Sequence, residues 1–160
     1  MSACRLVLLD TDANERHYPV TGSTYNPSDG EAIGMPNKPD KALDTLATVC
    51  SLCNNANLES LADGSVQVNG EPTEGALKVL VEKMWPHADS ANGDASASAK
   101  GASHLRPIES VCDSYCSQYE QTALLEFDRQ RKSMSVLARR RGEQNSLFVK
   151  VLTCLFQLSL

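Results

Sequence analysis

An aromatic ring and a guanidinium group two residues apart, Phe127 and Arg129, have the types and spacing that suit nucleotide chemistry. The ring offers a flat stacking face, and the guanidinium is a planar fork that pairs with phosphate oxygens. They fall in a predicted hairpin: residues 122–127 are apolar and β-favouring, a mostly basic turn follows, and residues 133–137 alternate polar and apolar. From the pattern alone, an ordinary hairpin with a core Phe and a solvated Arg is the commoner case, because short motifs often arise by chance.

The same segment resembles a known family. Leu125-Glu-Phe-Asp-Arg-Gln-Arg-Lys-Ser-Met-Ser-Val136 closely resembles the nucleotide-domain signature of P-type calcium-transporting ATPases of the sarco/endoplasmic reticulum kind. Other stretches agree with the family in the same order along the chain: Met1-Ser-Ala-Cys4, Leu46-Ala-Thr-Val-Cys-Ser-Leu-Cys-Asn54, Gly70-Glu-Pro-Thr-Glu-Gly-Ala-Leu77 and Phe148-Val-Lys150. The resemblance covers residues 1–150, and several ordered motifs are more specific than one.

This resemblance implies an α/β (α+β) domain, an antiparallel β-sheet flanked by helices, with ATP bound in a cleft on one side. It implies that adenine stacks on Phe127, that Glu74 lines the adenine pocket and that Lys150 lies at the cleft floor. Arg129 would reach toward the phosphates, with Lys132 a weaker candidate for the same rim. Mg²⁺ accompanies the nucleotide in the intact family member. Without this resemblance, Glu74 is interpreted as an acidic residue in the first turn of a predicted helix, where its charge complements the helix dipole.

The intact family member transfers the γ-phosphate of ATP to an aspartate in an Asp-Lys-Thr-Gly-Thr motif. This chain does not contain that motif, and no run of eighteen apolar residues is present to span a membrane. We therefore expect it to bind nucleotide without hydrolysing ATP or transporting an ion. The expected partners are ATP and the remainder of a transporter, with the domain facing the cytoplasm and the parent family in the endoplasmic reticulum membrane.

Composition is that of a single globular domain. Of 160 residues, 41% are hydrophobic and 22% charged, and the net charge is −5. Residues 129–150 nevertheless hold seven basic residues against one acid, which suits an anionic ligand on an acidic protein. An alternative is a nucleic-acid or protein-interaction module that uses the basic hairpin and Arg139-Arg-Arg141. Overall acidity and few aromatics argue against that alternative.

Four of the six cysteines have spacings that are compatible with binding a metal ion. Cys50 and Cys53, with Cys112 and Cys116, could supply four thiolates to zinc. The same spacings, three and four residues on predicted helices, favour small buried core residues instead. We expect the core role and no resident metal.

The elements that must position these residues follow from periodicity and turn residues. Asp40 is the predicted N-cap of a helix through Cys53, and Thr73 the predicted cap of the helix over 72–84. Residues 86–104 read as a flexible insertion within the domain. The remaining predicted elements are strands over 4–9, 17–22, 65–69 and 146–150 and a helix over 106–119.

The resemblance ends at Lys150. The family continues Gly-Ala-Pro-Glu, whereas residues 151–160 here form an uncharged, mostly apolar tail. This tail is half the length a membrane helix needs. We expect it to extend the last strand or to add to an exposed sheet edge, and to promote self-association. The divergence also predicts that the chain is a truncated fragment, with a non-functional product as the blander alternative.

Overall fold

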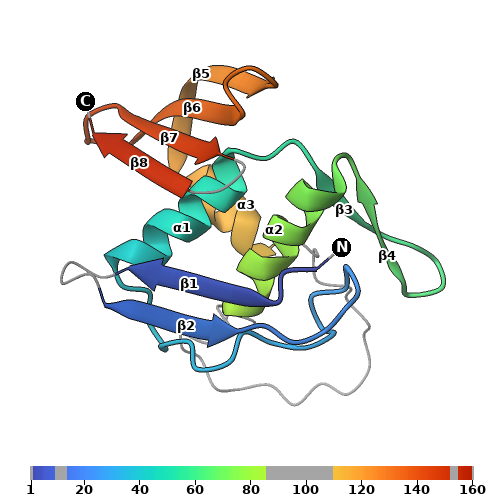
Figure 1. Ribbon diagram of the computed structural model, residues 1–160. Helices are drawn as coiled ribbons and strands as arrows, with labels where there is room; N and C mark the ends of the chain where they lie inside the picture. Colours follow the sequence, from blue (N-terminus) through green and yellow to red (C-terminus); the bar gives the residue numbers. More distant parts are fainter. Residues whose placement is uncertain (1, 10–13, 86–109, 152–154, 160) are drawn as a thin grey trace, which may run out of the picture.

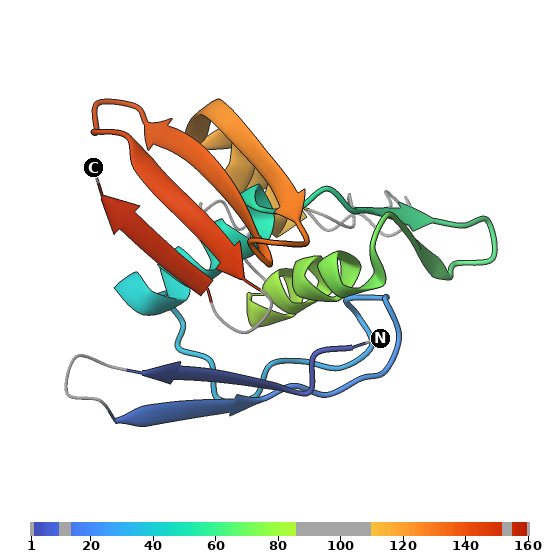
Figure 2. The same ribbon diagram turned by 45° about the horizontal axis from the view of Figure 1, so that its top comes forward.

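The computed structural model describes residues 2–9, 14–85, 110–151 and 155–159. Its helices lie between two β layers, with a two-stranded sheet on one side and a four-stranded sheet on the other (Figures 1 and 2). The predicted class, antiparallel sheet flanked by helices, is confirmed. The predicted insertion over 86–104 lies outside the described residues.

Helix α1 (Lys41–Leu52) is the centre of the molecule. Asp40 caps it as predicted, because its Oδ1 accepts from the backbone N–H of Leu43 at 2.9 Å. The helix is apolar on two faces. One face packs with the N-terminal hairpin and the other helices, while Val49 and Leu52 pack with the four-stranded sheet. A helix between two layers must be apolar on both sides.

Helix α2 (Pro72–Met84) begins where predicted, but the predicted cap was wrong. Glu71 is the N-cap and its side chain makes no capping hydrogen bond, while Thr73 lies inside the first turn. Pro72 sits in the first turn, where its missing N–H costs no intrahelical bond. Near the other end, the buried carboxylate of Glu82 accepts from the backbone N–H groups of Val111 and Cys112.

These hydrogen bonds to Glu82 hold the first turn of helix α3 (Ser110–Ser117). Of the predicted helix over 106–119, residues 106–109 lie outside the described residues, and Tyr119 begins a strand. Two hairpins lie outside the main sheet. Strands β1 (Arg5–Leu9) and β2 (Glu15–Pro19) form one, and β3 (Asn57–Ser60) and β4 (Val66–Asn69) form the other. Strand β3 was not predicted, because Leu58 is its only buried residue and leaves no alternation to detect.

The four-stranded antiparallel sheet runs β5 (Tyr119–Asp128), β6 (Ser133–Arg140), β7 (Ser146–Val151) and β8 (Leu155–Ser159) in spatial order. The predicted hairpin is therefore present. Strand β8 belongs to the apolar tail and pairs with β7 in register Lys150↔Leu155 to Ser146↔Ser159. The tail thus adds to a sheet edge of its own chain, and the expectation of self-association through it finds no support.

Three of the described cysteines, Cys50, Cys53 and Cys112, are buried, whereas Cys4 is exposed. Cys50 and Cys112 lie in the core shared by the helices and the N-terminal hairpin, and Cys53 lies in the core under the sheet. Cys116 is partly buried beside that second core. In the described ranges no three His, Cys, Asp or Glu side chains group closely enough to hold a metal ion.

Candidate functional site

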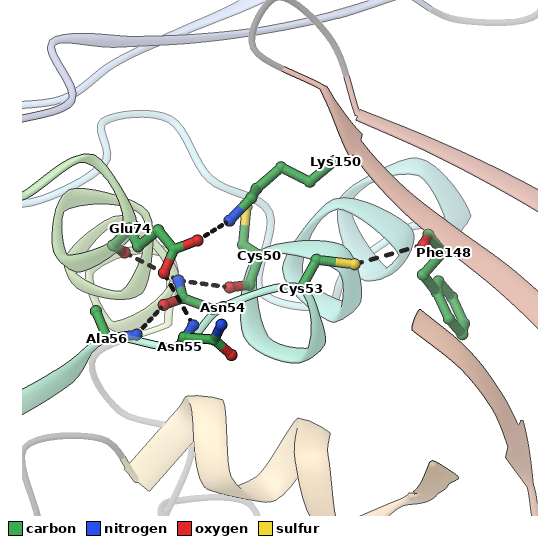
Figure 3. A network of polar contacts seen from close by, with 8 residues as sticks. All are labelled: Cys50, Cys53, Asn54, Asn55, Ala56, Glu74, Phe148 and Lys150. Carbon is green, nitrogen blue, oxygen red and sulfur yellow. Dashed lines mark hydrogen bonds and ion pairs between the residues drawn. The ribbon is translucent and has the colours of Figure 1, made fainter. Parts of the chain in front are cut away.

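Glu74 and Lys150 meet in a nearly buried ion pair. Glu74 lies in the first turn of α2. Lys150 lies on β7 and pairs with Met134 of β6, so the two side chains share the sheet face that packs against α1. Lys150 Nζ donates to Glu74 Oε1 at 2.6 Å, and the two side chains are 10% and 12% exposed (Figure 3). Two of the predicted site residues, distant in the sequence, are thereby brought together.

The second oxygen of Glu74 is also held. The backbone N–H of Asn55 donates to Oε2 at 2.9 Å (Figure 3). An acidic residue three positions after an N-cap often reaches back to that cap. Glu74 instead reaches across to the segment that leaves α1. A carboxylate has about four acceptor positions, so two protein donors leave room for a ligand donor.

Asn54 joins the ends of the two helices beside this pair. Its Nδ2 donates to the carbonyl of Cys50 at 3.0 Å and to the carbonyl of Glu74 at 2.9 Å. Its Oδ1 accepts from the backbone N–H of Ala56 at 3.0 Å. The sequence predicted only a helix through Cys53, which Asn54 follows. The contact to Glu74 spans 20 residues, and no local signal announces it.

The thiols of Cys50 and Cys53 lie near Lys150 (Figure 3). Cys53 Sγ donates to the carbonyl of Phe148 at 3.5 Å, which ties the end of α1 to β7. Burial raises the pKa of the Cys50 thiol to about 12 and that of Cys53 to about 11, although the nearby Lys150 ammonium opposes the rise. Both groups are therefore neutral at physiological pH and leave the positive charge of Lys150 to Glu74.

The other predicted site residues lie on the β5–β6 hairpin. Phe127 is 47% exposed, so the core-Phe interpretation of the pattern is wrong. Arg129 and Lys132 are exposed in the turn, where Lys132 has a positive φ of 54°. Asp128 shapes this turn because its Oδ1 accepts from the backbone N–H groups of Gln130 and Arg131. These hydrogen bonds lower the pKa of the Asp128 carboxyl.

The sheet brings this hairpin near the ion pair. Asp128 pairs with Ser133, and the adjacent Met134 pairs with Lys150. Phe127 and Lys150 are therefore at the same end of the sheet with β6 between them, two strand spacings or about 10 Å apart between backbones. The structure joins Glu74 to Lys150 directly, whereas Phe127, Arg129 and Lys132 lie across β6 from that pair.

The second basic cluster lies at the opposite end of β6. Arg139 donates two hydrogen bonds to Glu120, and the Arg140 guanidinium lies 5.3 Å over the ring of Tyr119. A surface hollow nearby is lined by both signs of charge, including Arg141 and Glu143. Arg139 is thus paired with an acid and Arg140 with an aromatic ring, which gives little support to the nucleic-acid alternative.

The sequence of this chain is similar to those of known proteins. The family described as "P-type ATPase, cytoplasmic domain N" matches residues 42–151. Calcium-transporting ATPases 2 and 4, endoplasmic reticulum-type, of Arabidopsis thaliana are 38% and 36% identical to this chain over 84% of its length. A probable calcium-transporting ATPase of Trypanosoma brucei brucei is 32% identical over 94%.

The chain spans only 12–15% of the length of these relatives. In the part of the chain that the structure describes, no helix is long and apolar enough to cross a membrane. The matched segment contains the ion pair, Asn54 and the whole β5–β6 hairpin. The chain belongs to the family of P-type ATPase cytoplasmic N domains.

Proposed function

We propose that this chain binds ATP, as part of the nucleotide-binding domain of a P-type calcium-transporting ATPase. The observation that carries the proposal is the nearly buried Glu74–Lys150 pair, which joins two of the family motifs at one end of the sheet. A buried ion pair is a costly feature that often serves a site. Here it lies beside the hairpin with an exposed aromatic ring.

In this proposal the base lies between the ion pair and Phe127. The ring stacks on one face of adenine, a contact worth about 1–3 kcal/mol by analogy with other base platforms. Glu74, paired with a cation, acts as a hydrogen-bond acceptor. It therefore suits a base with an exocyclic amino group, and a 6-oxo group would meet it unfavourably.

The phosphates in this proposal extend over the β5–β6 turn. Arg129 offers a fork of N–H donors, and Lys132 a more compact positive charge on the same turn. Both side chains are exposed and free to move toward an anion. Mg²⁺ would travel with the phosphate oxygens and offset part of their charge.

Binding is proposed without turnover. The sequence contains no Asp-Lys-Thr-Gly-Thr motif to receive a phosphoryl group. The relatives named above are calcium-transporting ATPases of the endoplasmic reticulum type, so the natural partner would be the rest of such a transporter, with this domain on its cytoplasmic side. Calcium transport itself would belong to that larger protein.

Isothermal titration of the full chain with ATP, alongside a phosphate-release assay, tests the proposal. We expect a Kd between about 1 mM and tens of micromolar, which corresponds to about 4–7 kcal/mol. No steady phosphate release should accompany it. Absence of heat up to several millimolar ATP would contradict binding, and steady release by the purified chain would contradict the absence of turnover.

A further inference from the structure

We propose that Asn54 is a positioning residue that orients the Glu74 carboxylate and thereby sets a preference for a 6-amino base. This inference rests on the proposed ATP binding. Asn54 would not touch the nucleotide itself. It would act through the backbone of two neighbouring segments, one on each side of the carboxylate (Figure 3).

The first step is the fixed position of the Asn54 amide. Both hydrogens of Nδ2 have partners, the carbonyl of Cys50 in the last turn of α1 and the carbonyl of Glu74 in the first turn of α2. Helix ends leave carbonyls without intrahelical partners, so the first bond also satisfies the end of α1. The second bond holds the main chain of Glu74 directly. The Asn54 side chain thus links the end of α1 to the start of α2.

The second step is the direction of the Asn55 N–H. Asn54 Oδ1 accepts from the backbone N–H of Ala56, two residues later, which is the Asx-turn geometry. That bond curls the chain around residue 55. The N–H of Asn55 then donates to Glu74 Oε2. Removal of the Asn54 amide would release this turn and the Glu74 main chain together.

The third step is the effect on Glu74. Its Oε1 is held by Lys150 and its Oε2 by Asn55, so the plane of the carboxylate is defined by two donors on different segments. Loss of one donor would let the carboxylate rotate about Lys150. A rotated group aligns less well with a ligand amino group, because hydrogen bonds weaken steeply away from linearity.

The experiment compares ATP with ITP, which carries a 6-oxo group in place of the amino group. The wild-type chain should bind ATP more tightly, and Asn54→Ala should reduce the ATP-to-ITP affinity ratio about fivefold or more. Asn55→Ala is the matched control, because only the backbone of Asn55 contacts Glu74. It should leave the ratio unchanged. In a Glu74→Ala background, Asn54→Ala should have no further effect on the ratio.

A purely structural role for Asn54 would weaken ATP and ITP by the same factor and would overturn the inference. If Asn54→Ala does not fold, Asn54→Asp replaces it, since it keeps the acceptor for Ala56 and loses both donated bonds, to Cys50 and to Glu74. Failure of the wild type to bind either nucleotide would contradict the proposed function.

Positioning is also measured without nucleotide. Amide hydrogen exchange by NMR should show the Asn55 N–H exchanging about tenfold faster in Asn54→Ala than in the wild type, while amides of β6 are unaffected. Unchanged exchange at Asn55 would overturn the positioning role whether or not the chain binds ATP.

Discussion

Lys150 on β7 and Glu74 on α2 form an ion pair at 2.6 Å although 76 residues separate them in the chain. Each side chain is about one-tenth exposed. At such depth the Coulomb gain and the desolvation cost are both large, so the pair is stable only while both members are present. Replacement of one member should therefore destabilise the fold more than replacement of both.

Removal of the lysine alone should destabilise the fold strongly. Lys150→Met leaves the Glu74 carboxylate buried without its cation, and we expect the free energy of unfolding to fall by about 3 kcal/mol. Lys150→Met combined with Glu74→Gln should lose less than the single change. Urea denaturation followed by circular dichroism measures both. Lys41→Met, at an exposed position, is the control and should cost little; an equal loss there would contradict the role of the pair.

Phe127→Ala should weaken ATP, ADP and AMP by similar factors. The ring is proposed to touch only the base, which the three nucleotides share, and loss of stacking costs about 1–3 kcal/mol. Isothermal titration with each nucleotide measures the three factors. Leu125→Ala is a matched control, since Leu125 is an apolar residue of the same strand with 44% exposure against 47% for Phe127. Comparable losses in the control would show that the strand, and not the ring, matters.

Arg129→Ala should weaken ATP and ADP more than AMP. The guanidinium is proposed to reach the outer phosphates, which AMP lacks, and a charge-assisted hydrogen bond contributes about 1.5–3 kcal/mol. Competition titrations with the three nucleotides at fixed ionic strength measure the difference. Arg141→Ala removes the same charge at the opposite end of β6 and should change all three affinities little. Equal losses across the nucleotides for Arg129→Ala would place the guanidinium away from the β- and γ-phosphates.

The cap of α1 should make stability depend on acid. The hydrogen bond from the Arg16 guanidinium, then that from the Leu43 backbone, lower the pKa of Asp40 below its usual value. The ionised carboxylate therefore stabilises the folded chain above about pH 4, the pKa of an unfolded Asp. This contribution is lost as the pH falls through the lower pKa of the folded state.

Asp40→Asn isolates that dependence because asparagine also caps helices but does not titrate. We expect the wild type to be the more stable chain at pH 7 and its advantage to shrink below pH 4, as measured by urea denaturation from pH 7 to pH 3. A constant difference over this range would show that Asp40 does not contribute through its charge.

Local signals predicted most of the elements, although not strand β3, and they did not predict the tertiary contacts. The predicted N-cap Asp40 was sufficient to place the start of α1, because capping is decided within a few residues. The Thr73 prediction failed because the chain turns into the helix two residues earlier, at Glu71.

For the site, the family resemblance named Glu74 and Lys150 but not the bond between them. Neither the ion pair nor the Asn54 bridge is visible in the sequence, since both depend on how α1, α2 and β7 meet. The exposure of Phe127 could not be predicted from an apolar strand pattern either, because an edge strand exposes side chains that the same pattern would bury in a central strand.

The close approach of α2 to β4 yields the last prediction, at Gly75 beside Glu74. Alanine in a helix is normally more favourable than glycine by about 1 kcal/mol. Here a Cβ would lie 2.5 Å and 2.6 Å from the two methyl groups of Val68, which is closer than atoms can pack. Moving the helix away costs about 1–3 kcal/mol, and Val68 has little rotamer freedom to yield. Gly75→Ala should therefore lower the free energy of unfolding in urea by about 1 kcal/mol.

The double variant Gly75→Ala/Val68→Ala removes the obstructing methyl groups and should lose less than the sum of its two single changes. A Gly75→Ala chain more stable than the wild type would show that α2 moves freely, and the alignment of Glu74 with Lys150 would then tolerate more than these contacts imply.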